Sequence, residues 1–154
     1  MKNATAIVCL FGLAIVPIFV AADLKDEFLD LHNKFREEAG VAPLEWDDKL
    51  AAYARDYANK RASDCQQLHS NGPYGENIYW GYGDGFTSPN AAIRWWLKEK
   101  NHLVSETNKC ADGKLCTNYK QLASSETKRV GCARVTCGDG NTFMICNYEP
   151  KISS

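Results

Sequence analysis

The sequence has no excess of charge of either sign. Its 154 residues contain 18 lysines and arginines against 19 aspartates and glutamates, which gives a formal net charge of −1 at pH 7. A protein that binds nucleic acid or anionic lipid through its overall charge needs a marked positive excess. We therefore expect no nucleic-acid partner.

Motifs of common hydrolases and zinc proteins are also missing. The chain has no G-x-S-x-G nucleophile motif and no closely spaced C-x-x-C pairs. Ser70 directly follows His69, and a serine next to a histidine in sequence is rarely placed to share its proton. Because no nucleophile with an activating base is evident, we predict that the protein is not an enzyme.

No apolar run is long enough for a confident membrane span. The longest, Ala4–Val20, is shorter than the roughly 20 residues that a spanning helix needs. It follows the basic Lys2 and ends at the small residues Ala21 and Ala22. This pattern predicts a secretory signal peptide over residues 1–22, with a membrane anchor as the alternative. We expect a secreted, extracellular protein, apoplastic if its source is a plant.

Residues 23–154 are long enough for one domain with one hydrophobic core. An even number of cysteines in an oxidising compartment predicts three disulfides, for which about 15 pairings exist. Cys110 and Cys116 are the pair favoured by local geometry, because the Asp-Gly between them suits a tight turn. The six cysteines are Cys65, Cys110, Cys116, Cys132, Cys137 and Cys146.

Three segments have the apolar spacing of helices. The first covers Asp26–Glu38, and His32 beside its apolar stripe is assigned a hydrogen-bonded structural role rather than a ligand role. The second begins after Asp47 or Asp48, either of which can cap it. The third begins at Ser88 and Pro89 and runs to about Leu103.

Adjacent tryptophans lie in the third predicted helix. We assign Trp95 and Trp96 first to the core, because both side chains are large and apolar. An aromatic binding platform is the alternative.

Three short runs have the composition of strands. They are rich in β-branched and aromatic residues, and the last two are joined by the turn sequence GDGN. Helices come first and a hairpin comes last, which favours an α+β fold with helices on an antiparallel sheet. The runs are NIYWG (77–81), RVGCARVTC (129–137) and TFMICNY (142–148).

Several phrases together resemble one family. They are HSNGPYGEN (69–77), WWLKEK (95–100), KRVGCARVTC (128–137) and CNYEP (146–150). They are similar to the plant pathogenesis-related class-one proteins, whose superfamily also contains cysteine-rich secretory proteins and insect venom antigen-five allergens. The resemblance covers about residues 23–150.

The resemblance implies a fold and a disulfide pattern. Residues 23–154 would form a single CAP (SCP) domain, a three-layer α-β-α sandwich with a central antiparallel sheet. The implied bridges are Cys65–Cys137, Cys110–Cys116 and Cys132–Cys146. The glycine- and proline-rich C-terminal extension of the family is truncated here to KISS.

The family also has a cleft with two histidines and two glutamates that holds a divalent metal in some members. The resemblance places His69, Glu76 and Glu99 at three of these positions, but the fourth, a histidine, is Asn118. A neutral amide is a poor ligand for a zinc-like ion. We therefore expect no cofactor and at most weak binding of a divalent metal. His102, three residues after Glu99, is a less favoured replacement ligand.

Loss of the metal changes the electrostatics expected in the cleft. Two carboxylates at close range raise the pKa of one of them unless a protonated His69 lies between them. The amide of Asn118 can hydrogen-bond one of the carboxylates and so keep the cleft folded.

The segment Asn118–Ser125, which the resemblance associates with sterol binding, is also altered, and Ala123, Ser124 and Ser125 reduce its aromatic and apolar content. We call it the altered segment. We predict a secreted, non-enzymatic plant defence-type protein, a monomer, that binds a sterol, another lipid or a protein partner. One alternative is a metal-dependent hydrolase that uses His69, Glu76 and Glu99. The other is a diverged interaction or decoy protein that presents a new surface at Lys114–Lys128.

Overall fold

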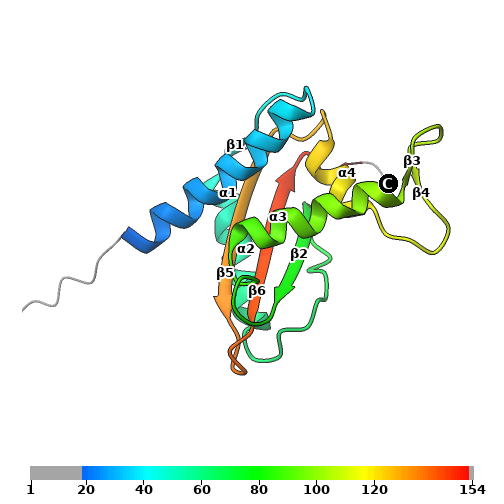
Figure 1. Ribbon diagram of the computed structural model, residues 1–154. Coiled ribbons are helices and arrows are strands. Elements are labelled where there is room, and N and C mark those ends of the chain that lie inside the picture. Colours follow the sequence, from blue (N-terminus) through cyan, green and yellow to red (C-terminus); the bar gives the residue numbers. More distant parts are fainter. Residues whose placement is uncertain (1–18, 153–154) are drawn as a thin grey trace, which may run out of the picture.

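A computed structural model of the chain describes residues 19–152 (Figure 1). Most of the predicted signal peptide, residues 1–22, lies outside this range, so its cleavage stays a prediction. Helix α1 spans Phe19–Glu38, and thus begins before the Asp26 at which we expected it. Within residues 19–152, no helix has the length and apolar character needed to cross a membrane.

The central sheet has the strand order β1-β5-β6-β2. The long strands β5 (Arg129–Thr136), β6 (Thr142–Glu149) and β2 (Gly75–Gly81) are antiparallel, which confirms the sheet predicted from sequence. The two-residue strand β1 (Glu45–Trp46) was not predicted. It pairs with β5 in parallel and makes the sheet mixed.

Helices cover both faces of this sheet. Helices α1, α3 (Pro89–Lys98) and α4 (Thr117–Ala123) pack together on one face (Figure 1). Helix α2 (Asp48–Arg61) packs on β5 and β6 from the other face. The result is the α+β, three-layer α-β-α sandwich that the sequence and its resemblance indicated.

Two predicted helix starts are confirmed by their caps. The Asp47 carboxylate accepts hydrogen bonds from the backbone N–H groups of Lys49 and Leu50, at the start of α2. The Ser88 hydroxyl does the same for Ala91 at the start of α3. Such caps satisfy N–H groups that have no partner within the helix.

The end of the third helix and the region after it differ from the prediction. Helix α3 stops at Lys98, and a 3₁₀ turn, η1 (Glu99–His102), continues it. The short hairpin of β3 (Leu103–Val104) and β4 (Lys109–Cys110) follows. Neither this hairpin nor α4 was predicted.

The core has two parts, one on each face of the sheet. The larger part lies between the sheet and α1 and α3, and includes Phe28, Met144 and the completely buried Trp96. The smaller part lies under α2 and includes Ala54 and Phe143. The core assignment of Trp95 was wrong, because 57% of its surface is exposed. Adjacent residues of a helix point in different directions, so Trp95 faces solvent while Trp96 is buried.

Close approach of α2 to the sheet requires a glycine on β5. A Cβ atom on Gly131 would lie 2.1 Å from the backbone N of Ala51 and 2.6 Å from the carbonyl carbon of Leu50. Both are backbone atoms that cannot move aside as a flexible side chain can. Gly131 therefore lets the first turn of α2 lie directly against the strand.

Three disulfides are present, with the pairing that the resemblance implied. Cys132 and Cys146 lie opposite each other on β5 and β6. Cys65–Cys137 joins the segment after α2 to the end of β5, and Cys110–Cys116 closes a short loop before α4. Only Cys65–Cys137, with a sequence separation of 72, links elements that are distant in sequence, whereas Cys132–Cys146 joins the two strands of one hairpin.

Two ionisable side chains of α1 are completely buried. The guanidinium of Arg36 donates hydrogen bonds only to backbone carbonyl oxygens, at 2.6–3.3 Å, and so joins α1 to the segment after α4. The four acceptors are Ala42, Leu122, Ser124 and Thr127.

His32 has the structural role that the sequence suggested. Its Nδ1 lies 2.7 Å from the carbonyl oxygen of Phe28, and its Nε2 lies 2.9 Å from the hydroxyl of Tyr148. Burial lowers the pKa of His32 to about 4. The ring is therefore neutral at physiological pH, with one nitrogen donating and the other accepting.

This burial makes a prediction about stability in acid. Because the pKa of His32 is about 4 in the folded protein and ordinarily 6.5, the unfolded chain binds more protons between these values. The free energy of unfolding should therefore decrease as the pH falls through this window, by up to about 3 kcal/mol from this residue. Denaturant unfolding near neutral pH and at about pH 4 measures the loss.

The matched variant is His32→Gln, which keeps a polar side chain but does not titrate. Its free energy of unfolding should decrease less on acidification than that of the unmodified protein. An equal decrease in both proteins would show that His32 does not cause the acid sensitivity.

Candidate functional site

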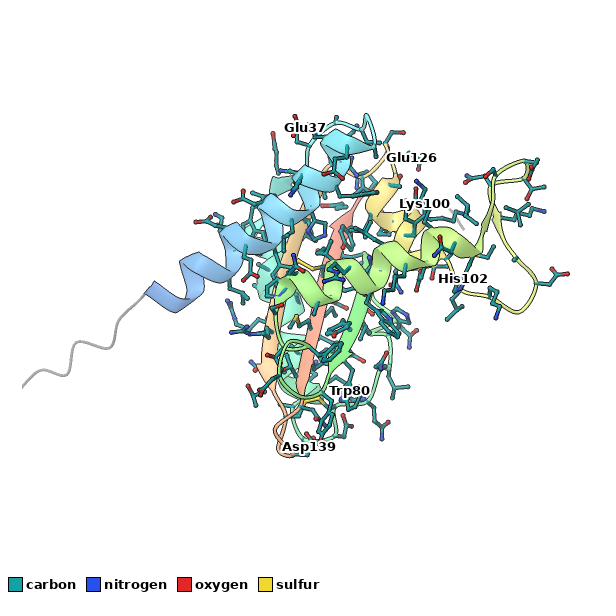
Figure 2. All side chains as sticks on the ribbon, viewed as in Figure 1. Glu37, Trp80, Lys100, His102, Glu126 and Asp139 are labelled. Carbon is teal, nitrogen blue, oxygen red and sulfur yellow. A yellow bond between two sulfur atoms is a disulfide. The ribbon has the colours of Figure 1, made fainter. Side chains whose placement is uncertain are left out.

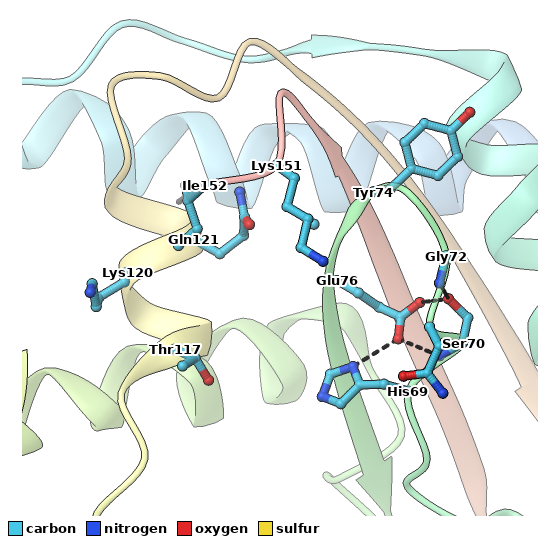
Figure 3. A pocket seen from close by; sticks show the side chains of 12 residues that line it. His69, Ser70, Gly72, Tyr74, Glu76, Thr117, Lys120, Gln121, Lys151 and Ile152 are labelled. Carbon is cyan, nitrogen blue, oxygen red and sulfur yellow. Dashed lines mark hydrogen bonds and ion pairs between the residues drawn. The ribbon is translucent and has the colours of Figure 1, made fainter. Parts of the chain in front are cut away.

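Glu76 on β2 is surrounded by hydrogen-bond donors. One carboxylate oxygen accepts from the backbone N–H of Ser70 at 2.9 Å and lies 2.8 Å from Nδ1 of His69 (Figure 3). The other accepts from the hydroxyl of Ser70 at 2.5 Å and from the amide of Asn147 at 3.2 Å. Asn147 is opposite Glu76 in the β2–β6 register, so the sheet itself positions this contact.

The pair of Glu76 and His69 favours its charged form. Burial by itself would raise the pKa of Glu76, but the hydrogen bonds from His69, Ser70 and Asn147 outweigh it and lower that pKa. The hydrogen bond to Glu76 raises the pKa of His69, against a smaller opposing effect of burial. From the sequence we expected a raised pKa for one of the two carboxylates unless a protonated His69 lies between them. The pKa of Glu76 is lowered, and His69 contacts this carboxylate.

Glu99 forms a second, separate cluster with the start of α4. It is 9% exposed, and its Oε2 accepts hydrogen bonds from the backbone N–H groups of Asn118 at 2.9 Å and Tyr119 at 3.3 Å. Its Oε1 accepts from the Asn118 side-chain amide at 2.7 Å. The amide that stands at the fourth cleft position therefore binds Glu99, one of the two partners that the sequence allowed.

The two clusters approach β2 from different faces of the sheet. Successive strand residues point to opposite faces, and Asn77, next to Glu76, donates to the Asn118 carbonyl at 3.1 Å. The α4 side of the strand thus carries Asn118 and Glu99, whereas Glu76 points toward Ser70 and Asn147.

The donor set as placed does not fit a zinc-like ion. Among residues 19–152, the only three metal-ligand side chains whose ligand atoms lie within 4.8 Å of one another are His32, Cys132 and Cys146. Both sulfurs of that group are in a disulfide and cannot act as thiolate ligands. His69, Glu76 and Glu99 do not form such a group, and their degenerate metal site remains a prediction.

Two residues considered in the sequence analysis have other partners. Nδ1 of His102 lies 2.7 Å from the carbonyl oxygen of Leu115. The ring therefore contacts a residue that is not one of the cleft positions. The Ser70 hydroxyl donates to Glu76 and not to His69. A serine held in this way has no histidine to take its proton.

A hollow of about 350 Å³ lies beside the His69–Glu76 pair, between the segment before β2, α4 and the residues after β6 (Figure 3). Sequence reasoning did not single out several of its lining residues, among them Lys151, whose side chain extends into the space near Glu76. Lys120 is also part of the lining. Its place in the altered segment was the only feature of the sequence that could have pointed to it. Thr117 and Gln121 of α4 and Ile152 complete that side.

Comparison with known proteins agrees with this fold. The model of the cysteine-rich secretory protein family, CAP, matches residues 29–148, so the chain belongs to this family. Within it, similar curated proteins are plant pathogenesis-related proteins. Pathogenesis-related protein 1C of Nicotiana tabacum is 45% identical over 130 residues, 84% of this chain and 77% of that protein. Pathogenesis-related protein PR-1 of Medicago truncatula is 47% identical over 133 residues, 86% of this chain and 76% of that protein.

Solved structures show the same architecture. MpPR-1i has a TM-score of 0.65 at 25% sequence identity and covers 88% of this chain and 93% of its own. Schistosoma mansoni venom allergen-like protein 4 has a TM-score of 0.68 at 24% identity and covers 84% of this chain and 89% of its own.

The cleft geometry makes a prediction about zinc. In Asn118→His, an imidazole replaces the amide beside Glu99, and zinc affinity should rise at least about tenfold, the usual scale for a change at a metal site. Calorimetric titration of both proteins with zinc measures this. Tight zinc binding by the unmodified chain would contradict our interpretation of Asn118.

The His69–Glu76 contact makes a second prediction. In Glu76→Gln, the pKa of His69 should decrease toward its ordinary value, because the carboxylate that raises it is gone. Titration of the ring proton by NMR follows this shift. The matched control is the exposed Glu37→Gln on α1, which should leave the pKa of His69 unchanged. A His69 pKa that is the same in all three proteins would exclude the contact in solution.

Proposed function

We propose that this plant pathogenesis-related protein is a secreted, non-enzymatic defence protein that binds an apolar ligand of the sterol or lipid kind. The observation that supports it most is a hollow of about 270 Å³ whose lining is mainly aromatic. We call it the aromatic hollow. Its lining residues are Gln67, Tyr79, Trp80, Tyr82, Phe86 and Trp95.

Aromatic rings are unusually exposed at this hollow. Trp95 is 57% exposed, Phe86 59% and Tyr82 69%. The rings of Trp80 and Tyr82 are nearly parallel, with an interplanar angle of 9° and centroids 6.3 Å apart. Large apolar side chains gathered at one exposed place mark a ligand or partner site more often than single exposed residues do. Flat rings of this kind suit a flat, apolar ligand.

The aromatic hollow is separate from the altered segment. Trp80 lies near the end of the sheet where the β5–β6 turn with Asp139 is found, whereas Lys100 and His102 follow the other end of α3 (Figure 2). Beside the altered segment, a second hollow is lined mainly by polar residues such as Ser124, Ser125 and Glu126, with Leu103, Ala123 and Ile152 as its apolar members. That polarity favours a water-filled groove there and leaves the aromatic hollow as the better place for an apolar ligand.

In the part of the chain that the structure describes, Ser70 and the cysteines are engaged in other contacts, which supports a non-enzymatic role. Ser70 donates to a carboxylate, and all six cysteines of residues 23–154 are in disulfides. Secretion is supported by these disulfides, since such bonds persist in oxidising compartments. Metal-dependent hydrolysis would need His69, Glu76 and Glu99 on one ion, and the zinc titration above also tests that alternative.

Equilibrium binding of a fluorescent sterol to residues 23–154 tests the proposal. We expect saturable binding that Trp95→Ala weakens about tenfold, because truncation of an exposed aromatic contact residue removes a typical 1–2 kcal/mol. The matched control is Leu115→Ala, which removes another exposed apolar side chain, 70% exposed, outside the hollow. No saturable binding by the unmodified protein, or an equal loss in both variants, would refute the apolar-ligand site.

A further inference from the structure

Two lysines bring unpaired positive charge to the hollow beside His69 and Glu76. Lys120 on α4 and Lys151 after β6 both line it. Among residues 24–152, whose side chains the structure describes, the ion pairs with nitrogen and oxygen within 4.0 Å involve only arginines and His69 as the basic partners. In the described structure, therefore, neither lysine has a carboxylate partner. Lys151 is directed into the hollow toward the His69–Glu76 pair (Figure 3).

The carboxylate in this hollow is already fully engaged. Both oxygens of Glu76 accept two contacts each, from His69, from Ser70 twice and from Asn147. Glu76 contributes at most one negative charge, which the two ammonium groups outweigh. Glu99, the other acidic residue of the cleft positions, does not line the hollow and is bound to the start of α4.

A divalent cation and an anion require opposite surroundings. A cation needs carboxylates or imidazoles with lone pairs free to coordinate, whereas the lone pairs of Glu76 face hydrogen-bond donors. An oxyanion needs ammonium and hydroxyl donors at the wall of an accessible cavity. Lys120, Lys151 and the hydroxyl-bearing Thr117 supply these donors around about 350 Å³, which is large enough for a phosphate carried on a larger molecule.

We propose that this hollow binds an oxyanion, as a phosphate, sulfate or carboxylate group, held by the ammonium groups of Lys120 and Lys151. The lining of this hollow is therefore suited to an anion rather than to a cation. This site is distinct from the aromatic hollow and does not depend on the sterol proposal.

Titration of residues 23–154 with inorganic phosphate, followed by NMR, tests the site. We expect a roughly millimolar dissociation constant and shifts of the backbone signals of Gly72 and Thr117, which line the hollow. Lys151→Gln and Lys120→Gln should each weaken binding roughly tenfold, because each removes one charge-assisted contact. Both side chains lie at the surface of the hollow, so neither variant should unfold the protein.

The matched control is Lys60→Gln, which removes the same charge from an exposed position on α2 outside the lining. It should leave the affinity unchanged. A second titration compares glucose 6-phosphate with inorganic phosphate, and glucose serves as the control that lacks the anion. Binding of the sugar phosphate as tight as that of inorganic phosphate would indicate a phosphate carried on a larger ligand, and weaker binding would indicate the free ion.

Two results would overturn the proposal. One is no saturable phosphate binding by the unmodified protein. The other is an equal loss of affinity in Lys60→Gln, Lys120→Gln and Lys151→Gln, because that would show attraction by overall charge and no site.

Discussion

The structure depends on β6, a strand that is paired on both edges and covered on both faces. It hydrogen-bonds to β5 and β2 along its length, and seven of its eight residues are buried. Most buried polar groups find partners within the protein, and two side chains of β6 find them on neighbouring elements. Tyr148 contacts His32 of α1, while Asn147 donates to Glu76 of β2. The cleft is thus attached to the most buried strand of the sandwich.

Each glutamate of the cleft is satisfied by donors from nearby backbone and side chains. Burial of a carboxylate costs free energy unless the charge is paired and hydrogen-bonded. Glu76 meets that need through Ser70 and His69, and Glu99 through two backbone N–H groups and the amide of Asn118. The cleft can therefore stay folded without an ion. In the lining of the hollow beside Glu76, the charged side chains other than the His69–Glu76 pair are Lys120 and Lys151.

Sequence alone predicted the elements that local rules determine. The caps at Asp47 and Ser88 and the β5–β6 hairpin follow from short-range chemistry. Strand β1 escaped prediction because two residues have no periodicity, and only pairing with β5 makes them a strand. Helix α4 is seven residues long, too short for an apolar stripe. The positions of His69, Glu76 and Glu99 came from family resemblance. The approach of Lys151 to His69 and Glu76 arises from the path of the chain after β6, which no local pattern encodes.

The binding of Arg36 has a consequence for how this protein can diverge. Its guanidinium is held only by carbonyl oxygens of the main chain, two of them from Leu122 and Ser124 in the altered segment. Every amino acid supplies such an oxygen, so replacement of the outward side chains there leaves the anchor intact. Substitutions on the exterior of this segment therefore leave the acceptors of Arg36 in place, so its surface can vary without loss of this anchor.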